Sequence, residues 1–493
     1  MNNQQNSITI SGMKFTFITG AILIFASGCV NNLSAEPANS IILGQGQIAG
    51  EVTQTSVIVQ SRLTTAMNET SEYAEGVEGT GCFEISTSPE FVNSFRTHWL
   101  KAEKQNDYII RAQVAGLQPG TKYFWRVLYG ENKDKAGFGR VCRFRTLGGK
   151  DEHRKVSLAV VTGMNYARFH LGKDSYKGED KKLGYPALET ILKMKPDFFV
   201  GTGDNVYYDH PQGKLAAKSR SQIRKKYHEQ FCQQRYIELF AEVPTYWEKD
   251  DHDYRYNDCD NTGKTKPSAA LGWEIFREQL PVTDPTDETA VTYRTHRINQ
   301  DLQIWLVEGR DYRSANSMTD GPGKTIWGKE QKHWLKETLS ASDATFKILI
   351  SPTPMIGPDD GYKKDNHTNI GGFRYERDEF FRWLKDNSFD KKGFYIVCGD
   401  RHWQYHSIDI SGFEEFSCGA LVDANSRIGR KPGDPKSTDP EDTIKQPYCM
   451  QKASGGFLLI TVEPGENGGC PKAHFDFYNE NGMELYSHTK EGK

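Results

Sequence analysis

The pattern of apolar and polar positions changes near residue 150. Before that point, short stretches with alternating apolar and polar residues are separated by turn-rich segments, which is typical of β-strands in an all-β domain. The predicted strands cover 56–63, 81–86, 108–114, 122–129 and 139–146. We therefore expect a β-sandwich over residues 45–147, with a short glycine-containing linker at 148–150.

After residue 155, short apolar strands alternate with longer helical patterns, and this alternation predicts α/β layers. The predicted strands cover 156–161, 198–200, 243–247, 302–308, 346–351 and 393–398. The predicted helices cover 185–194, 223–240, 268–279, 328–341 and 375–385. Residues 420–447 are rich in Gly, Pro, Ser, Asp and Lys and predict an exposed loop, and 455–462 and 472–478 predict closing strands. A second domain is thus expected over 155–490.

Composition narrows the class of protein. The chain has 493 residues, 37% of them hydrophobic and 26% charged, which fits a soluble globular protein of two or three domains. Its formal net charge of −3 gives no electrostatic footprint for nucleic acid. The net charge does not exclude a negatively charged small-molecule substrate, because metal ions and nearby arginines set the local field of a site.

The first residues resemble an export signal. Lys14 precedes a short apolar stretch at 15–25, and small residues lead to Cys29 in a lipobox-like sequence. Residues 1–29 would be the signal peptide and 30–44 a tether. The alternatives are a cell-envelope lipoprotein (periplasmic or surface), a protein secreted without an anchor, and a buried structural segment. Membrane contact is expected only through the lipid anchor.

Cysteine usage agrees with export. Apart from Cys29 there are eight cysteines, an even number that allows disulfides in an oxidising compartment. We expect one bond between Cys82 and Cys142 and another between Cys232 and Cys259. Buried free thiols are the alternative.

Three clusters of carboxylate and imidazole groups follow apolar strands. The first is Gly-Asp-Asn-Val-Tyr, with Asp204 and Tyr207; the second is Asp-Asp-His with Asn257 nearby; the third is Gly-Asp-Arg-His, with Asp400 and His402. Ligands at the carboxyl ends of strands converge on one edge of an open α/β sheet. Together they offer enough oxygen and nitrogen ligands for two metal ions. Taken singly, each cluster could instead be a helix cap, a salt bridge or a solvated turn.

The order Gly-Asp-x-x-Tyr, Asp-Asp-His, Glu-x-Arg-x-Tyr-Arg (308–313) and Gly-Asp-x-His resembles the alkaline phosphatase D (PhoD) group of metallophosphoesterases. That group is distantly similar to purple acid phosphatases. The resemblance covers roughly residues 45–480. It implies a metallophosphoesterase sandwich of two mixed sheets flanked by helices (α/β or α+β), preceded by a PhoD-type, fibronectin type III-like β-domain.

The resemblance also suggests roles for the ligands. Asp204 would bridge two metals, Tyr207 would bind one of them and Asp251 the other, and the remaining predicted ligands are Asn257, Asp400 and His402. His252 would then be free to stabilise the phosphoryl oxygens or protonate the leaving alkoxide.

Two arginines are candidates for binding phosphate. Arg310 or Arg313 could grip it with a planar guanidinium, and a buried ion pair with Glu308 or Asp311 is the alternative reading.

The sequence departs from the family near its first strand. Gly163 stands where PhoD proteins often carry an iron-binding cysteine, and Asn165 could replace that ligand. The middle strand also ends in Ser351, without the histidine of general metallophosphoesterases. The resemblance implies Fe³⁺ with Ca²⁺, and oxygen-rich ligands suit calcium independently.

The predicted function is therefore that of an exported phosphoesterase that hydrolyses phosphomonoesters, phosphodiesters or both at a two-metal site. One alternative is a monoesterase similar to purple acid phosphatases. Another is a catalytically inactive surface binding protein on the same fold. The sequence leaves the natural substrate, the metals and the oligomeric state open.

Overall fold

The computed structural model describes residues 41–67, 73–284, 286–287, 289–465 and 469–492. The predicted signal peptide at 1–29 and residues 30–40 of the predicted tether lie outside the described residues. Within the described part, no helix is both long enough and apolar enough to cross a membrane.

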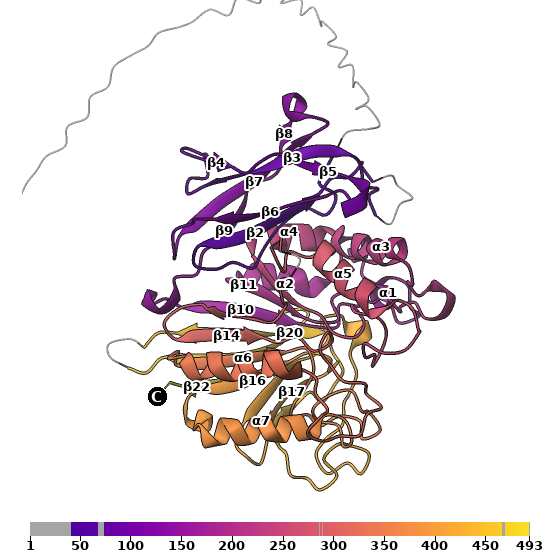
Figure 1. Cartoon of the computed structure of the whole chain (residues 1–493), viewed down its shortest axis with the longest axis vertical. Coiled ribbons are helices and arrows are strands. Elements are labelled where there is room, and N and C mark those ends of the chain that lie inside the picture. The colour runs from indigo at the N-terminus through magenta and orange to yellow at the C-terminus, as the bar shows by residue number, and fades with distance from the viewer. Residues whose placement is uncertain (1–40, 68–72, 285, 288, 466–468, 493) are drawn as a thin grey trace, which may run out of the picture. The chain divides into compact units, whose positions relative to one another are not determined.

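Two large mixed sheets dominate the fold (Figure 1). The nine-stranded sheet contains, in spatial order, β22 (Glu484–Glu491), β21 (Lys472–Asn479), β20 (Gly456–Glu463), β10 (Val156–Val161), β11 (Phe198–Thr202), β12 (Thr245–Glu248), β1 (Gln47–Gly50), β2 (Ser56–Arg62) and β6 (Ile109–Ala115). The seven-stranded sheet contains β13 (Arg294–Arg297), β14 (Leu302–Leu306), β15 (Phe346–Ser351), β16 (Phe394–Cys398), β18 (Glu414–Cys418), β17 (Gln404–Ile408) and β19 (Lys445–Cys449).

A smaller sheet is formed by residues 79–145. It contains β4 (Phe95–Arg96), β3 (Gly79–Ser86), β7 (Lys122–Gly130) and β8 (Gly137–Phe138), with β5 (Leu100–Ala102) beside β3 and β9 (Cys142–Arg145) beside β7. The predicted strands at 56–63 and 108–114 correspond to β2 and β6. Together with β1, which was not predicted, they extend the nine-stranded sheet, because β1 pairs in parallel with β12 through Gly50 and Thr245. The sequence pattern does not show this connection.

Helices cover the outer faces of the two large sheets. They are α1 (Tyr166–His170), α2 (Pro186–Met194), α3 (Arg220–Phe231), α4 (Gln234–Glu242), α5 (Ala269–Gln279), α6 (Gly328–Ala341) and α7 (Arg374–Asp386). The nine-stranded sheet packs against α2 to α5, and α6 and α7 lie on the seven-stranded sheet (Figure 1). The fold is therefore the predicted one, two mixed sheets flanked by helices.

Side-chain alternation explains these layers. In β10, Leu158 and Val160 point into the core between the sheets, and Ala159 and Val161 point towards the helices. Both faces are buried, so the strand reads as one continuous apolar run.

The structure corrects two predicted elements. The helix predicted over 223–240 is divided into α3 and α4 at Cys232 and Gln233. The segment 420–447 is not simply an exposed loop, since Leu421, Asn425 and Thr438 are buried in it.

The predicted disulfides are wrong, because the structure joins neither Cys82 to Cys142 nor Cys232 to Cys259. Cys82 and Cys142 lie on strands that pair with opposite edges of β7. Such strands are about 9.5 Å apart, whereas the Cα atoms of a disulfide lie within about 7 Å. Cys232 and Cys259 instead donate to the backbone carbonyls of Glu229 and Asp251.

Candidate active site

Three strand ends meet at one edge of the stacked sheets. Asp204 follows β11, the 250–253 segment follows the adjacent parallel strand β12, and Asp400 follows β16 of the facing sheet. Gly399 allows the close approach of the two sheets, because a Cβ atom there would lie 2.3 Å from the carbonyl oxygen of Thr202. The structure thus brings the three predicted clusters into one site.

Asp204 is held in an unusual backbone conformation. Its φ is +54°, in the left-handed region that few non-glycine residues adopt. Gly203 before it has a φ of +80°, and a Cβ atom there would lie 2.5 Å from the Cβ of Asp250. The Gly-Asp pair is therefore required by the tight turn that carries the carboxylate into the site.

Asp204 is almost fully buried and only partly satisfied. Its Oδ2 accepts a hydrogen bond from the Tyr207 hydroxyl at 2.8 Å, and His402 Nε2 lies 3.5 Å from the same oxygen. Its Oδ1 has no hydrogen-bond partner among the described residues. A buried carboxylate oxygen without a partner is costly, and a cation would satisfy it.

His252 is fixed between acidic and aromatic neighbours. Its Nδ1 lies 2.7 Å from Asp209 Oδ1, and its ring stacks on Tyr207 with centroids 4.2 Å apart. Burial lowers the pKa of His252, but the nearby carboxylates, Asp251 foremost, raise it by a larger amount. The pKa of His252 is therefore well above its ordinary value. Asp204, Asp251 and His252 offer ligand atoms within 4.8 Å of one another.

Asp251 lies just behind the cavity wall. Its oxygens accept backbone hydrogen bonds from His252 at 2.8 Å and Asp258 at 2.5 Å. Asn257, the predicted assisting ligand, has an exposed side chain at the rim, and its backbone N–H donates to Asp209. Backbone N–H groups of the loop thus orient the carboxylate of Asp251. The side chain of Asn257 forms no hydrogen bond with that carboxylate.

Asp400 is surrounded by positive charge. Asp400 forms an ion pair with Arg401. Burial raises the pKa of Asp400, but the positive charges of Arg401 and Lys363 lower it by more, so the pKa lies below the usual range. Lys363 also pairs with Asp258 at 2.8 Å. This carboxylate is therefore ionised at any physiological pH.

Arg310 does not reach the cavity. Its guanidinium is fully buried, with Nε 2.6 Å from Asp250 Oδ1 and Nη1 2.7 Å from the carbonyl oxygen of Cys259. Arg313 is also buried and donates to the carbonyl of Asp365. Both predicted phosphate-binding arginines are thus buried behind the site. Arg310 thus forms a buried ion pair, but with Asp250 and not with Glu308 or Asp311.

Asn165 and Gly163 lie close to the site, but neither lines the cavity. Asn165 caps α1 through the N–H of Arg168, and its Nδ2 lies 2.7 Å from His210 Nδ1. Gly163 has a φ of +67°. Asn425, from the segment 420–447, donates to the Tyr207 oxygen at 2.9 Å and to the Gly163 carbonyl at 3.2 Å.

These side chains enclose a cavity of about 330 Å³. It is lined by Arg168, Asp204, Tyr207, His210, Gln212, His252, Asn257, Lys363, Asp400, Arg401, His402, Ala424, Asn425, Ser426 and Arg427. Six predicted residues line it: Asp204, Tyr207, His252, Asn257, Asp400 and His402. Sequence reasoning missed the cations Arg168, Lys363, Arg401 and Arg427. Only Arg401, inside the third motif, carried a local signal.

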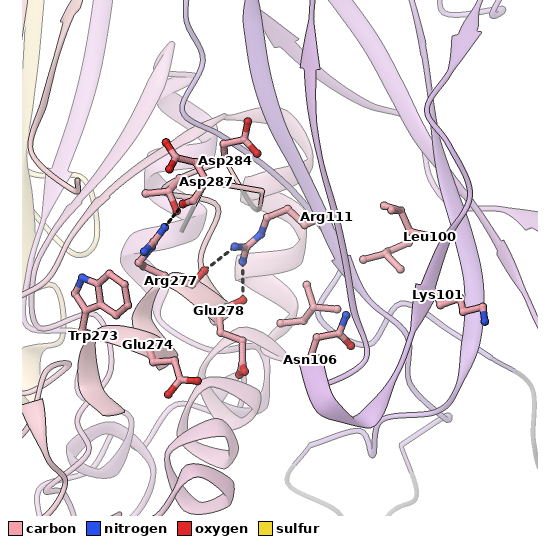
Figure 2. A pocket seen from close by; sticks show the side chains of 13 residues that line it. Leu100, Lys101, Asn106, Arg111, Trp273, Glu274, Arg277, Glu278, Asp284 and Asp287 are labelled. Atoms are coloured by element: carbon pink, nitrogen blue, oxygen red, sulfur yellow. Dashed lines mark hydrogen bonds between the residues drawn. The ribbon is translucent and has the colours of Figure 1, made fainter. Parts of the chain in front are cut away.

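Another cavity, of about 620 Å³, lies between β5, β6 and α5 (Figure 2). Its lining includes Trp273, Asp284 and Asp287, and Arg111 points across it to the last turn of α5. Among the described residues, the clusters of His, Asp and Glu that could share a metal ion all lie outside this cavity. The strand-end cavity is therefore the candidate active site.

Comparisons with known proteins agree with this geometry. The family described as PhoD-like phosphatase matches residues 158–463, and its N-terminal domain matches residues 29–148. Alkaline phosphatase D of Bacillus subtilis (strain 168) is 19% identical over 431 residues, which is 78% of this chain and 69% of that protein.

Two solved structures share the fold. A structure of PhoD covers 92% of this chain and 90% of its own, with a TM-score of 0.68 and 17% identity. Purple acid phosphatase PPD1 from yellow lupin seeds covers 92% of this chain and 74% of its own, with a TM-score of 0.58 and 10% identity.

The stacked sheets are those of the PhoD fold, and their shared edge carries carboxylates and imidazoles that could hold a metal ion. The chain belongs to the PhoD-like phosphatase family, and it is a phosphoric ester hydrolase.

Proposed function

We propose that this phosphoesterase cleaves phosphomonoesters and phosphodiesters with two metal ions held at the meeting point of β11, β12 and β16. The observation that carries the proposal is Asp204, a buried carboxylate with one oxygen unpaired and with Asp251 and His252 within reach. Such an oxygen is what a bridging ligand requires.

The donor set fits two cations. Asp204 would bridge them; Tyr207 and His402, whose polar atoms lie 3.2 Å apart, would complete one shell. Asp251 and Asp400 would hold the other, with Asn257 at the rim. A phenolate oxygen favours a hard ferric ion and carboxylates suit calcium, so we propose Fe³⁺ with Ca²⁺. Bound cations supply Lewis acidity, which neutralises phosphoryl charge and activates water.

The chain's own residues supply the remaining chemistry. His252 is anchored at Nδ1 by Asp209, which leaves Nε2 to deliver a proton to the leaving alkoxide. Arg427 lines the cavity, and 43% of its side chain is exposed. Its ion pair with Asp360 is long, with Nη2 3.4 Å from Oδ2. Arg427 replaces Arg310 as our candidate for gripping a phosphate oxygen.

The test measures metal content together with hydrolysis of a nitrophenyl monoester and a bis-nitrophenyl diester, with and without chelator. We expect about two tightly bound metals in the purified protein and loss of turnover on chelation. Asp204→Asn should lower turnover by roughly a hundredfold or more while the fold persists, because it removes the bridging charge.

The control is Asp378→Asn, which changes a half-exposed carboxylate on α7 whose ion-pair partner among the described residues is its neighbour Arg377. It should leave turnover unchanged. Well-folded wild-type protein with no metal and no turnover on either ester would instead support the non-catalytic binding protein.

We also propose that the protein is exported, with Cys29 as the lipidated first residue of the mature form. The support is the sequence pattern at 1–29 alone. The mass of the mature protein tests it: cleavage before Cys29 with added acyl chains is the expected result, and an intact Met1 would contradict it.

A further inference from the structure

A second group of metal-binding side chains lies away from the active-site cavity. His406 is on β17, Glu414 begins β18, and His488 is on β22. His406 Nε2 lies 3.0 Å from Glu414 Oε2, and His488 Nε2 lies 3.7 Å from the same oxygen. The three ligand atoms are all within 4.8 Å of one another, and none of the three residues lines the active-site cavity.

The neighbouring side chains orient this cluster. His406 is fully buried, and its Nδ1 lies 3.1 Å from the Tyr486 hydroxyl, so its Nε2 faces the carboxylate. Lys490 binds Glu414 Oε1 at 2.6 Å and leaves Oε2 to the two histidines. A metal-bound histidine in proteins generally donates its second ring N–H to such a partner, here the Tyr486 oxygen.

His488 supplies the observation that points to a missing ligand. Its Nε2 is buried and forms no hydrogen bond within the described residues. The rest of the side chain is partly exposed, at 29%.

We propose that His406, Glu414 and His488 form a second metal site, which binds Zn²⁺ and is separate from the catalytic centre. Two histidines and one glutamate are a known zinc donor set, with water as the fourth ligand. Bonds of about 2.0–2.1 Å in a tetrahedron place ligand atoms about 3.3 Å apart. The present separations of 3.0 and 3.7 Å lie on either side of that value.

The site would join the two large sheets. His406 and Glu414 belong to the seven-stranded sheet, whereas His488 lies on β22, the edge strand of the nine-stranded sheet. Zinc bound there would hold this edge strand against β17 and β18. Because it would bind the folded state alone, it would raise the thermal midpoint.

The test compares Zn²⁺ binding by full-length wild type and His488→Gln, by metal analysis and by titration against a chromophoric zinc chelator. We expect one equivalent more in the wild type, at least tenfold weaker binding by the variant, and a zinc-dependent rise in thermal midpoint only in the wild type. Phosphoesterase turnover should be equal, since His488 lies outside the active-site cavity.

Three further variants test the assignment of this site. His474→Gln removes a histidine of similar exposure, 27%, on the adjacent strand β21, and should retain the extra zinc. Asp204→Asn should also retain it, because its change is confined to the catalytic cluster. Tyr486→Phe should weaken binding by about tenfold. Equal zinc stoichiometry, affinity and thermal shift in wild type and His488→Gln would overturn the proposal.

Discussion

At the scale of single residues, Gly163 occupies a position where the structure disfavours the cysteine that the family resemblance suggests. Its φ of +67° is unfavourable for any residue with a Cβ atom. A Cβ atom there would lie 2.9 Å from the Cβ of Ala420 and 3.3 Å from Asn425 Nδ2. Asn425 fills the space next to Tyr207, so the local structure is built around glycine.

We therefore expect Gly163→Cys to destabilise the protein rather than to restore a ligand. Left-handed strain and the contact with Ala420 should lower the free energy of unfolding by roughly 1–3 kcal/mol. Urea unfolding checks this, with metal analysis of the folded fraction. A stable variant with an additional tightly bound iron would show that the segment 420–447 can move aside.

The meeting of the three motif segments could be predicted from the sequence because each segment begins directly after an apolar strand, β11, β12 or β16. Asp204 and Asp400 both come directly after a glycine at a strand end, so the local pattern places them. Arg427 and Asn425 could not be predicted, because a long connection after β18 brings them to the cavity. Arg310 was misplaced because the sequence does not show that it points to Asp250.

At the scale of elements, α5 depends on a strand far from it in sequence. Arg111 of β6 donates to the carbonyl oxygens of Arg277 and Glu278 in the last turn of α5, both at 2.6 Å (Figure 2). It thus satisfies two of the carbonyls that a helix leaves unpaired at its end and places a positive charge near the negative pole of the helix dipole.

Arg111→Gln should accordingly destabilise the protein by roughly 1–3 kcal/mol and increase hydrogen exchange in the last turn of α5. Lys101→Gln, in the same cavity on the exposed part of β5, is the control and should change neither quantity. Unchanged exchange in α5 of the Arg111 variant would show that water replaces the guanidinium at no cost.

Element boundaries were predictable where the apolar pattern is local. The strands predicted over 156–161 and 346–351 and the helix over 328–341 match β10, β15 and α6. The break between α3 and α4 was missed because neither glycine nor proline marks it. The pairing of β1 with β12 joins residues nearly 200 positions apart, and hydrophobic periodicity carries no information on such partners.

At the scale of the whole molecule, the backbone of a titratable residue, Glu480, attaches the C-terminal hairpin to the core. Glu480 lies in the turn between β21 and β22, and its backbone N–H donates to Gly455. Its carbonyl oxygen accepts a hydrogen bond at 2.8 Å from the Thr190 hydroxyl of α2. Burial foremost, with the charge of Asp423, raises the pKa of Glu480 to about 7.

This pKa makes stability depend on pH in a defined direction. An unfolded glutamate titrates near pH 4.3, so between about pH 4 and 7 the folded state binds more protons, and stability falls as pH rises. Glu480→Gln removes the ionisation and should match the wild type near pH 4 but exceed it at pH 8, by roughly 1–3 kcal/mol. Thermal midpoints at pH 4, 6 and 8 measure the difference. Glu484→Gln, at an exposed position on β22, should track the wild type throughout. A Glu480→Gln variant that is no more stable than the wild type at pH 8 would mean that the carboxylate is solvated in solution and carries no cost.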